Sequence, residues 1–503
     1  MKKLITLSFI FGFISGLNAQ DSLKLTEVQT QYLAEQKILG KKFSDGFYPD
    51  YMRMHQLSEK DFITKIGATA AEFDSLLNAY HSRLPKEYAA TERLEIKMYF
   101  DRLLVEYPYN HEIYTAERPK GYPIIERQIK DDLPLFNDPA LLENPEVRRF
   151  IQSFLSYKVN ARLSKPAYNG LYNKRLYAMW NMLPKYFKDR KCRNYQQYHL
   201  LLDHINNNGY KYTQQLYEAF KKENPDTAFV SKLARAYLDS QNDLKDHQVL
   251  EYKRIGDYGL DIHIFRKDSL PGKNKKPAIV FFHGGSWSEG QPSWHFAACR
   301  KYAEKGWVAC SVEYRIFGSQ GTLPFAAVMD ARSAIRWLRE HGDELGLDTG
   351  RIVATGNSAG GHLVLAAALA TGWNEKTDKL KFSPVPNVLL VNSGVYDLTD
   401  EKTAWIRKDL KNKSLVKGIS PNELVRHNLP PMLLVHSAAD QAVPYPSVQK
   451  FVALMKDADN KFEFRTLEKG GHFIFADPLY TPVVFSWRRE FLKQLGYPDA
   501  EGD

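Results

Sequence analysis

Ser358 lies in the stretch GNSAGG, between glycines and directly before the apolar run HLVLAAALA. An apolar stretch, RIVATGNS (351–358), leads into it, so a strand is expected to turn sharply at the serine and continue as a helix. Gly356 and Gly360 fit the pattern G-x-S-x-G, in which small neighbours permit a strained turn that exposes a nucleophilic hydroxyl. For this pentapeptide alone, a serine that caps a helix is an equal alternative, so the rest of the chain has to decide.

A serine nucleophile needs a base, and the base needs a carboxylate that orients it. Asp440 comes just after the apolar run in LLVHSAADQAVPY, and His472 lies in the glycine-rich stretch LEKGGHFIF. The chain order Ser358, Asp440, His472 is one of the orders in which Ser-His-Asp triads occur. These three side chains are the predicted catalytic residues.

A second glycine-rich stretch, VFFHGGSW (280–287), ends another apolar run. Ester cleavage builds negative charge on the carbonyl oxygen, and backbone N–H groups aimed at that oxygen stabilise it. The expected donors are the amides of Gly284, Gly285 and Ala359, the last being the residue after the nucleophile. His283 is expected to hold this loop, and Trp287 to contact the substrate.

The region from residue 248 onward alternates short apolar runs with helical segments. The expected strands are 248–256, 260–267, 278–285, 307–315, 351–358, 386–398, 430–440 and 462–468. The expected helices include 326–345, 359–370, 447–458 and 482–496. This alternation predicts an α/β fold with a mainly parallel sheet and helices on both faces. All four motifs fall at strand ends in this arrangement.

Residues 20–240 have a different pattern. Apolar residues recur at spacings of three and four in segments such as 25–43, 70–84, 144–163 and 227–241, and no alternating strand pattern is present. The sequence therefore predicts a mostly α-helical N-terminal domain (20–240) ahead of a catalytic domain (241–503). The aromatic residues between Tyr168 and Tyr198 are expected to form helical core, with a stacking surface for sugars as the alternative.

Residues 1–19 have the features of a signal peptide. Lys2 and Lys3 precede an apolar stretch, and small residues follow before Gln20. The apolar stretch is shorter than the roughly 20 residues of a membrane span. We therefore expect an exported protein, periplasmic or secreted, with no transmembrane span in the mature chain.

Charge and cysteine content exclude several classes of function. The formal net charge is +10, but the basic residues form short scattered clusters and no nucleic-acid-binding motif is present. The three cysteines show no zinc-ligand spacing. Cys299 and Cys310 are expected to be buried thiols, with a disulfide between them as the alternative.

Residues from about 248 to 496 resemble an α/β-hydrolase of the esterase/lipase group, on the motifs HGGSW, SVEYR, DARSAIRWLREH, GNSAGGH, SGVYDL and ADQAVPY. The pattern is most similar to carbohydrate esterases, namely acetylxylan and feruloyl esterases. The resemblance implies the α/β-hydrolase fold and a serine esterase that uses neither a metal nor an organic cofactor. Ser286 departs from the pattern, because related sequences often have a third glycine there.

Other assignments of the polar residues remain open. Asp397 in SGVYDL is an alternative acid, although Asp440 stands in the family's usual place before VP. Glu313 and His362 are expected to be structural. The substrate is expected to be an ester, with an acetylated or feruloylated poly- or oligosaccharide as the leading hypothesis. The alternatives are a small-molecule carboxylesterase, a serine exopeptidase of related fold, and a binding protein on an inactive hydrolase scaffold.

Overall fold

The computed structural model describes residues 25–499, apart from 49, 116, 118–120, 161, 164–165, 169, 225–226, 268–273 and 400–412. The predicted signal peptide, 1–19, lies outside the described residues. The described chain divides into two compact units. One takes in residues up to 163 and 178–197, and the other takes in 166–177 and 198–499.

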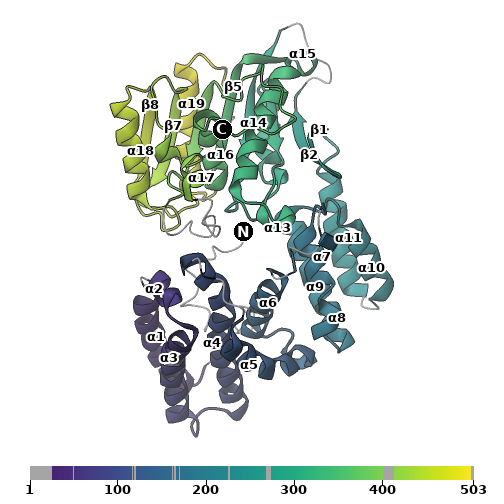
Figure 1. Ribbon diagram of the computed structural model, residues 1–503, viewed down its shortest axis with the longest axis vertical. Coiled ribbons are helices and arrows are strands. Elements are labelled where there is room, and N and C mark those ends of the chain that lie inside the picture. The colour runs from purple at the N-terminus through teal and green to yellow at the C-terminus, as the bar shows by residue number, and fades with distance from the viewer. Residues whose placement is uncertain are drawn as a thin grey trace. The chain divides into compact units, whose positions relative to one another are not determined.

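An eight-stranded sheet organises the second unit, with the strand order β1-β2-β4-β3-β5-β6-β7-β8. Figure 1 labels β1, β2, β5, β7 and β8 of this sheet. Its strands are β1 (Gln248–Ile255), β2 (Tyr258–Phe265), β3 (Lys276–Phe282), β4 (Val308–Val312), β5 (Leu347–Asn357), β6 (Val388–Asn392), β7 (Met432–Ser437) and β8 (Phe462–Leu467). β1 pairs antiparallel with β2, and β2 pairs antiparallel with β4. All strand pairs from β4 to β8 are parallel. The predicted α/β-hydrolase fold with a helical N-terminal region is confirmed.

Helices surround this sheet on both faces. They are α12 (Phe296–Glu304), α13 (Phe317–Gln320), α14 (Pro324–Glu340), α15 (Gly342–Leu345), α16 (Ala359–Leu369), α17 (Lys413–Lys417), α18 (Tyr445–Asp457) and α19 (Thr481–Gln494). Strand side chains alternate between the faces, so Val280 and Phe282 join the core under α14, α16 and α18. Ile279 and Phe281 join the core under α12 and α19.

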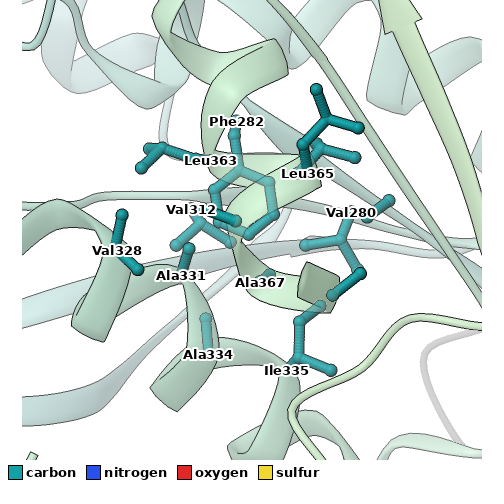
Figure 2. Close-up of a cluster of buried hydrophobic side chains, with 14 of the residues drawn as sticks. Val280, Phe282, Val312, Val328, Ala331, Ala334, Ile335, Leu363, Leu365 and Ala367 are labelled. Atoms are coloured by element: carbon teal, nitrogen blue, oxygen red, sulfur yellow. The ribbon is translucent and has the colours of Figure 1, made fainter. Parts of the chain in front are cut away.

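Helix α16 is the best buried of these helices, because every one of its residues is buried. Figure 2 shows its packing against the sheet and against α14. The labelled side chains are Val280, Phe282, Val312, Val328, Ala331, Ala334, Ile335, Leu363, Leu365 and Ala367. Burial of each large aliphatic side chain contributes about 1.5–3 kcal/mol, so the helix that follows Ser358 is held firmly against β3 and β5.

β1 is an outer strand of the sheet with an irregular pairing register. The register to β2 shifts between Glu251 and Lys253. Lys253 turns inward, and its Nζ lies 2.6 Å from the buried carboxylate of Asp330 on α14.

The helices before the sheet are α1 (Glu27–Phe47), α2 (Tyr51–Gln56), α3 (Glu59–Tyr80), α4 (Lys86–Thr115), α5 (Pro123–Asp132), α6 (Pro145–Asn160), α7 (Lys174–Trp180), α8 (Leu183–Tyr186), α9 (Arg190–Asn208), α10 (Gln214–Glu223) and α11 (Thr227–Asn242). The core of the first unit is strongly aromatic. Phe62 and Tyr107, for example, pack with ring centroids 4.4 Å apart.

The predicted boundary between residues 240 and 241 differs from this division, because 166–177 and 198–242 belong to the sheet unit. The Nζ of Lys211 lies 2.7 Å from Asp261 Oδ2 and 2.9 Å from Glu313 Oε2. The hydroxyl of Tyr172 also donates to Glu313. These polar anchors give no periodic pattern, so the apolar spacing could not reveal them.

Candidate active site

Ser358 forms the sharp turn between β5 and α16. Its backbone has φ 54° and ψ −121°, a strained conformation for a residue with a side chain. A Cβ on Gly360 would lie 2.0 Å from the carbonyl oxygen of Phe282, and a Cβ on Gly356 would lie 2.4 Å from the carbonyl carbon of Gly360. Only glycine fits at either position. The predicted strand–serine–helix turn is therefore present, with Ser358 half-buried at its tip.

The glycine loop after β3 passes directly beside this turn. A Cβ placed on Gly284 would lie 3.5 Å from the Cβ of Ser358. Gly285 has φ +103°, and a Cβ there would lie 2.1 Å from the carbonyl oxygen of Glu289. Ala359 is the first residue of α16, and first-turn amides have no acceptor within their own helix. The three predicted oxyanion donors thus belong to segments that adjoin Ser358.

His283 is buried and supports this loop. Its ring stacks on that of Tyr314 at a centroid distance of 4.1 Å, and its Nδ1 lies 2.8 Å from the carbonyl oxygen of Gly284. The Tyr314 hydroxyl donates to the His283 carbonyl oxygen at 2.6 Å. Burial lowers the pKa of His283 to about 3, so the ring is neutral at physiological pH. These contacts agree with a supporting rather than a chemical role.

Asp440 and His472 meet at the same edge of the sheet, after β7 and β8. Asp440 Oδ2 lies 2.8 Å from His472 Nδ1, and both side chains are buried. Asp440 Oδ1 accepts from the amides of Ala442 at 2.8 Å and Val443 at 2.9 Å. The carboxylate is therefore fixed by its own turn while its second oxygen orients the imidazole.

The electrostatics of this pair favour an ionised aspartate. Burial alone would raise the pKa of Asp440, but the bonds from His472 and from the Val443 amide, with the nearby His436, outweigh it and hold that pKa below its usual range. A carboxylate only accepts hydrogen bonds, so His472 Nδ1 carries the proton that it donates. In the neutral ring, Nε2 is then the basic nitrogen.

Ser358 and His472 lie after β5 and β8, whose carboxyl ends meet at one edge of the sheet. Within the described part of the chain, no hydrogen bond joins the Ser358 hydroxyl to His472. Such catalytic bonds are often long in a free enzyme and shorten only when substrate is bound.

In sequence, this sheet unit is similar to known esterases. The BD-FAE family model matches residues 260–455. Esterase LipC of Mycobacterium tuberculosis is 26% identical over 42% of this chain and 56% of its own length. Esterase LipQ of the same organism is 28% identical over 39% of this chain and 50% of its own length. The sheet unit is an α/β-hydrolase of the esterase/lipase family.

This chain spans about half the length of those curated relatives. The structure of esterase Est2 from Thermogutta terrifontis aligns at 31% identity over 52% of this chain and 96% of that chain, with a TM-score of 0.48. In the present α/β-hydrolase unit the family match contains Ser358 and Asp440 and ends before His472.

Other polar residues of the hydrolase unit have structural partners. Asp397 Oδ1 accepts from the Thr399 amide at 2.8 Å and from its hydroxyl at 2.6 Å, as in a turn, and no histidine among the described residues bonds to it. Glu313 is buried and bonded to Lys211 and Tyr172. His362 Nε2 lies 2.8 Å from the Ile419 carbonyl oxygen.

One expectation about the aromatic side chains needs correction. Trp287 was expected to contact the substrate, but it is only 3% exposed and packs edge-on against the His362 ring. The backbone at Trp287 has φ 55°, and this positive φ accompanies a side chain that lies in the core. Within the aromatic stretch 168–198, Tyr168, Tyr172, Tyr195 and Tyr198 are buried, which agrees with the expected core and not with an open stacking surface.

Sequence reasoning missed His436, which stands four residues before Asp440 in HSAAD. Its Nε2 lies 3.4 Å from Asp440 Oδ2. The signal was visible as a histidine on the strand that leads to the acid. Cys192, Cys299 and Cys310 are buried free thiols. Among the described residues no cluster of three or more His, Cys, Asp or Glu side chains could hold a metal ion.

Proposed function

We propose that this chain hydrolyses carboxylic esters through Ser358, His472 and Asp440. The observation that carries the proposal is the buried Asp440–His472 bond, at the sheet edge where the strained Ser358 turn and the Gly284 loop also lie. The family match and the esterase relatives support it.

In this reaction His472 Nε2 accepts the proton of Ser358 while the serine oxygen attacks the ester carbonyl carbon. The amides of Gly284, Gly285 and Ala359 stabilise the resulting oxyanion. The tetrahedral intermediate collapses, the carbon–oxygen bond to the alcohol breaks, and His472 gives its proton to the departing alcohol. Water then repeats these steps on the acyl-enzyme, with His472 again as base, and releases the acid and free Ser358.

Steady-state hydrolysis of nitrophenyl acetate by the full chain tests this proposal. Ser358→Ala should lose at least about a thousandfold in kcat, because no other group can form the acyl-enzyme. Ser240→Ala is the matched control, since its hydroxyl bonds only to a helix carbonyl oxygen, that of Ala236 at 2.9 Å. A folded Ser358→Ala protein with wild-type turnover contradicts the proposal. An inactive wild-type protein would favour a binding role for the scaffold.

We propose acylated carbohydrates as the substrate class, with acetyl or feruloyl groups removed from poly- or oligosaccharides. The similarity of the HGGSW, GNSAGGH and ADQAVPY motifs to carbohydrate esterases supports this, as does the BD-FAE match. A small-molecule carboxylesterase and a serine exopeptidase are the competing functions. A panel of acetylated and feruloylated oligosaccharides, nitrophenyl esters and aminoacyl anilides separates them by kcat/KM. Preference for the simple esters or for the anilides would overturn the carbohydrate assignment.

Export of the mature chain from Gln20 belongs to the same proposal, because polymeric carbohydrate lies outside the cell. The charged and apolar start of the sequence supports it. None of the described helices is long and apolar enough to cross a membrane. Intact mass of protein from the envelope or the medium tests this, and a full-length cytoplasmic chain would contradict it.

A further inference from the structure

The loop 284–291, which follows β3 and passes beside Ser358, has a backbone that needs outside support. Gly285 and Gly290 have φ +103° and +117°, and Ser286 and Trp287, which carry side chains, have φ 53° and 55°. A non-glycine residue with positive φ costs about 1–3 kcal/mol and persists only where its surroundings enforce it. The surroundings of this loop therefore determine where its amides point.

The carboxyl end of α9 supplies part of that support. The amide of Gly290 donates to the Asn207 carbonyl oxygen at 2.8 Å. The side-chain amide of Gln291 donates to the carbonyl oxygens of Ile205 at 3.3 Å and Asn206 at 2.9 Å. The last carbonyls of a helix lack intrahelical donors, and here the loop provides donors for those of Asn206 and Asn207. The Ile205 carbonyl oxygen accepts from the Gly209 amide at 3.1 Å and receives Gln291 as a second donor.

Helix α13 holds the same loop from another side. Phe317 N donates to the Trp287 carbonyl oxygen at 2.7 Å, and Gly318 N donates to that of Ser288 at 2.8 Å. The end of α9 also reaches α13, because a Cβ on Gly318 would lie 3.0 Å from Asn208 Nδ2. Two helices therefore bind the loop: α9, which precedes it in the sequence, and α13, which follows it.

The end of α9 is itself fixed to the sheet. Three residues after α9, Lys211 Nζ donates to the Gly259 carbonyl oxygen at 2.7 Å and to Glu313 at 2.9 Å. Lys211 and Asp261 are also ion-paired. A continuous series of contacts therefore links β2, Lys211, the end of α9 and the loop that carries Gly284 and Gly285.

We propose that the carboxyl end of α9 is a positioning element for the oxyanion donors, and that Gln291 is the positioning residue that links them. This inference rests on the proposed function. Oxyanion donors act mainly on the transition state, so a loosened loop should lower kcat and leave KM nearly unchanged. The segment ahead of the sheet would then contribute to catalysis without touching the substrate.

The test uses full-length Gln291→Ala, Gln291→Glu and Gln291→Lys with nitrophenyl acetate. The glutamate has the same shape but no donor and faces two carbonyl oxygens, whereas the lysine keeps a donor. We expect the alanine and glutamate variants to lose at least about tenfold in kcat, equivalent to about 1.4 kcal/mol, with KM within about twofold. The lysine variant should recover much of that loss. Binding of an aryl trifluoromethyl ketone, which forms a tetrahedral adduct with the serine, should weaken in parallel with kcat/KM.

Asn460→Ala is the matched control for a half-buried side-chain amide that bridges two loops. Asn460 Nδ2 donates to the Arg426 carbonyl oxygen and its Oδ1 accepts from the Leu429 amide, both at 2.8 Å. Its kcat should equal that of the wild type even if its unfolding midpoint falls. Titration of Ser358 with an organophosphate normalises all rates to folded, reactive sites.

Three results would overturn the inference: wild-type kcat in Gln291→Glu and Gln291→Ala, a rise in KM alone, or an equal kcat loss in Asn460→Ala. Its failure is distinguishable from failure of the proposed function. An active wild type, an inactive Ser358→Ala and unaffected Gln291 variants would reject only the role of α9. An active Ser358→Ala would reject the proposed function itself.

Discussion

His436 Nε2 lies 3.4 Å from Asp440 Oδ2, the oxygen that also accepts the bond from His472. The same nitrogen lies 3.1 Å from the Val443 carbonyl oxygen. A carbonyl oxygen only accepts, so Nε2 of His436 carries the proton and faces two acceptors. Burial lowers the pKa of His436, which keeps this ring neutral. Asp440 Oδ2 is thus contacted by a second imidazole besides the one that it orients.

Replacement of His436 by leucine should lower kcat about fivefold on nitrophenyl acetate, with KM nearly unchanged. The physical reason is the loss of a long, weak donor worth about 1 kcal/mol to the carboxylate. Steady-state kinetics at saturating substrate measure the change. His263→Gln is the comparison, since His263 is also buried but belongs to the antiparallel strand β2. Equal kcat in the leucine variant and the wild type would mean that Asp440 needs only its backbone amides.

The two candidate acids should respond very differently to amidation. Asp440→Asn should cost on the order of 10⁴ in kcat, by analogy with the triad aspartate of a serine protease, because His472 loses its orienting carboxylate. Asp397→Asn should stay within about threefold, since an asparagine oxygen can still accept from Thr399. Steady-state kinetics of both purified variants measure the two kcat losses. A larger loss in Asp397→Asn than in Asp440→Asn would identify Asp397 as the catalytic acid.

The glycine beside the nucleophile should tolerate no side chain. Gly360→Ala places a methyl group 2.0 Å from the Phe282 carbonyl oxygen, so α16 has to shift from β3. We expect a loss of stability of about 3 kcal/mol or more and an inactive protein, measured by urea unfolding and ester hydrolysis. Gly67→Ala in α3 is the counterpart, because apart from its chain neighbours and the nearby backbone of its own helix no atom lies within 4 Å of its added methyl group. That variant should gain about 0.5–1 kcal/mol, and a stable, active Gly360→Ala protein would contradict the packing.

Acid should unfold the hydrolase unit before it protonates the buried histidines. Burial lowers the pKa of His283 to about 3 and those of His295 and His362 to about 4. Unfolded histidine titrates near pH 6.5, so between about pH 6.5 and 4 the unfolded chain binds more protons and the free energy of unfolding falls as pH falls. Each histidine should account for about 2 kcal/mol between pH 7 and 5.

Urea unfolding followed by tryptophan fluorescence at pH 7 and pH 5 measures this dependence. His362→Gln keeps a donor for the Ile419 carbonyl oxygen but cannot be protonated. It should reduce the difference between the two pH values by about 2 kcal/mol, whatever its stability at pH 7. A stability that does not change between pH 7 and 5 would show that these rings take up protons in the folded state.

The parts of the fold that apolar patterns encode could be predicted, and those that depend on single polar contacts could not. The run AIVFFHGG predicted a strand, and β3 ends at Phe282 directly before the glycine loop. The domain boundary differed, because Lys211 and Tyr172 attach the preceding segment to Glu313 through isolated polar side chains. Within the site, residue type and order identified Ser358, Asp440 and His472 as candidates. Trp287 combines burial with a positive φ, and the neighbouring residue types indicate neither feature.

The register shift in β1 affects the tendency of this protein to aggregate at high concentration. A flat outer strand offers unpaired N–H and C=O groups to a strand of another molecule and so invites aggregation. β1 breaks that template with its irregularity between Glu251 and Lys253, and Glu251 is ion-paired with Arg254 at 2.5 Å. Lys253 on β1 points inward and adds a buried charge, which a regular sheet continued across two molecules could not accommodate. A sheet this rich in apolar strands therefore has an edge that resists pairing with a second sheet.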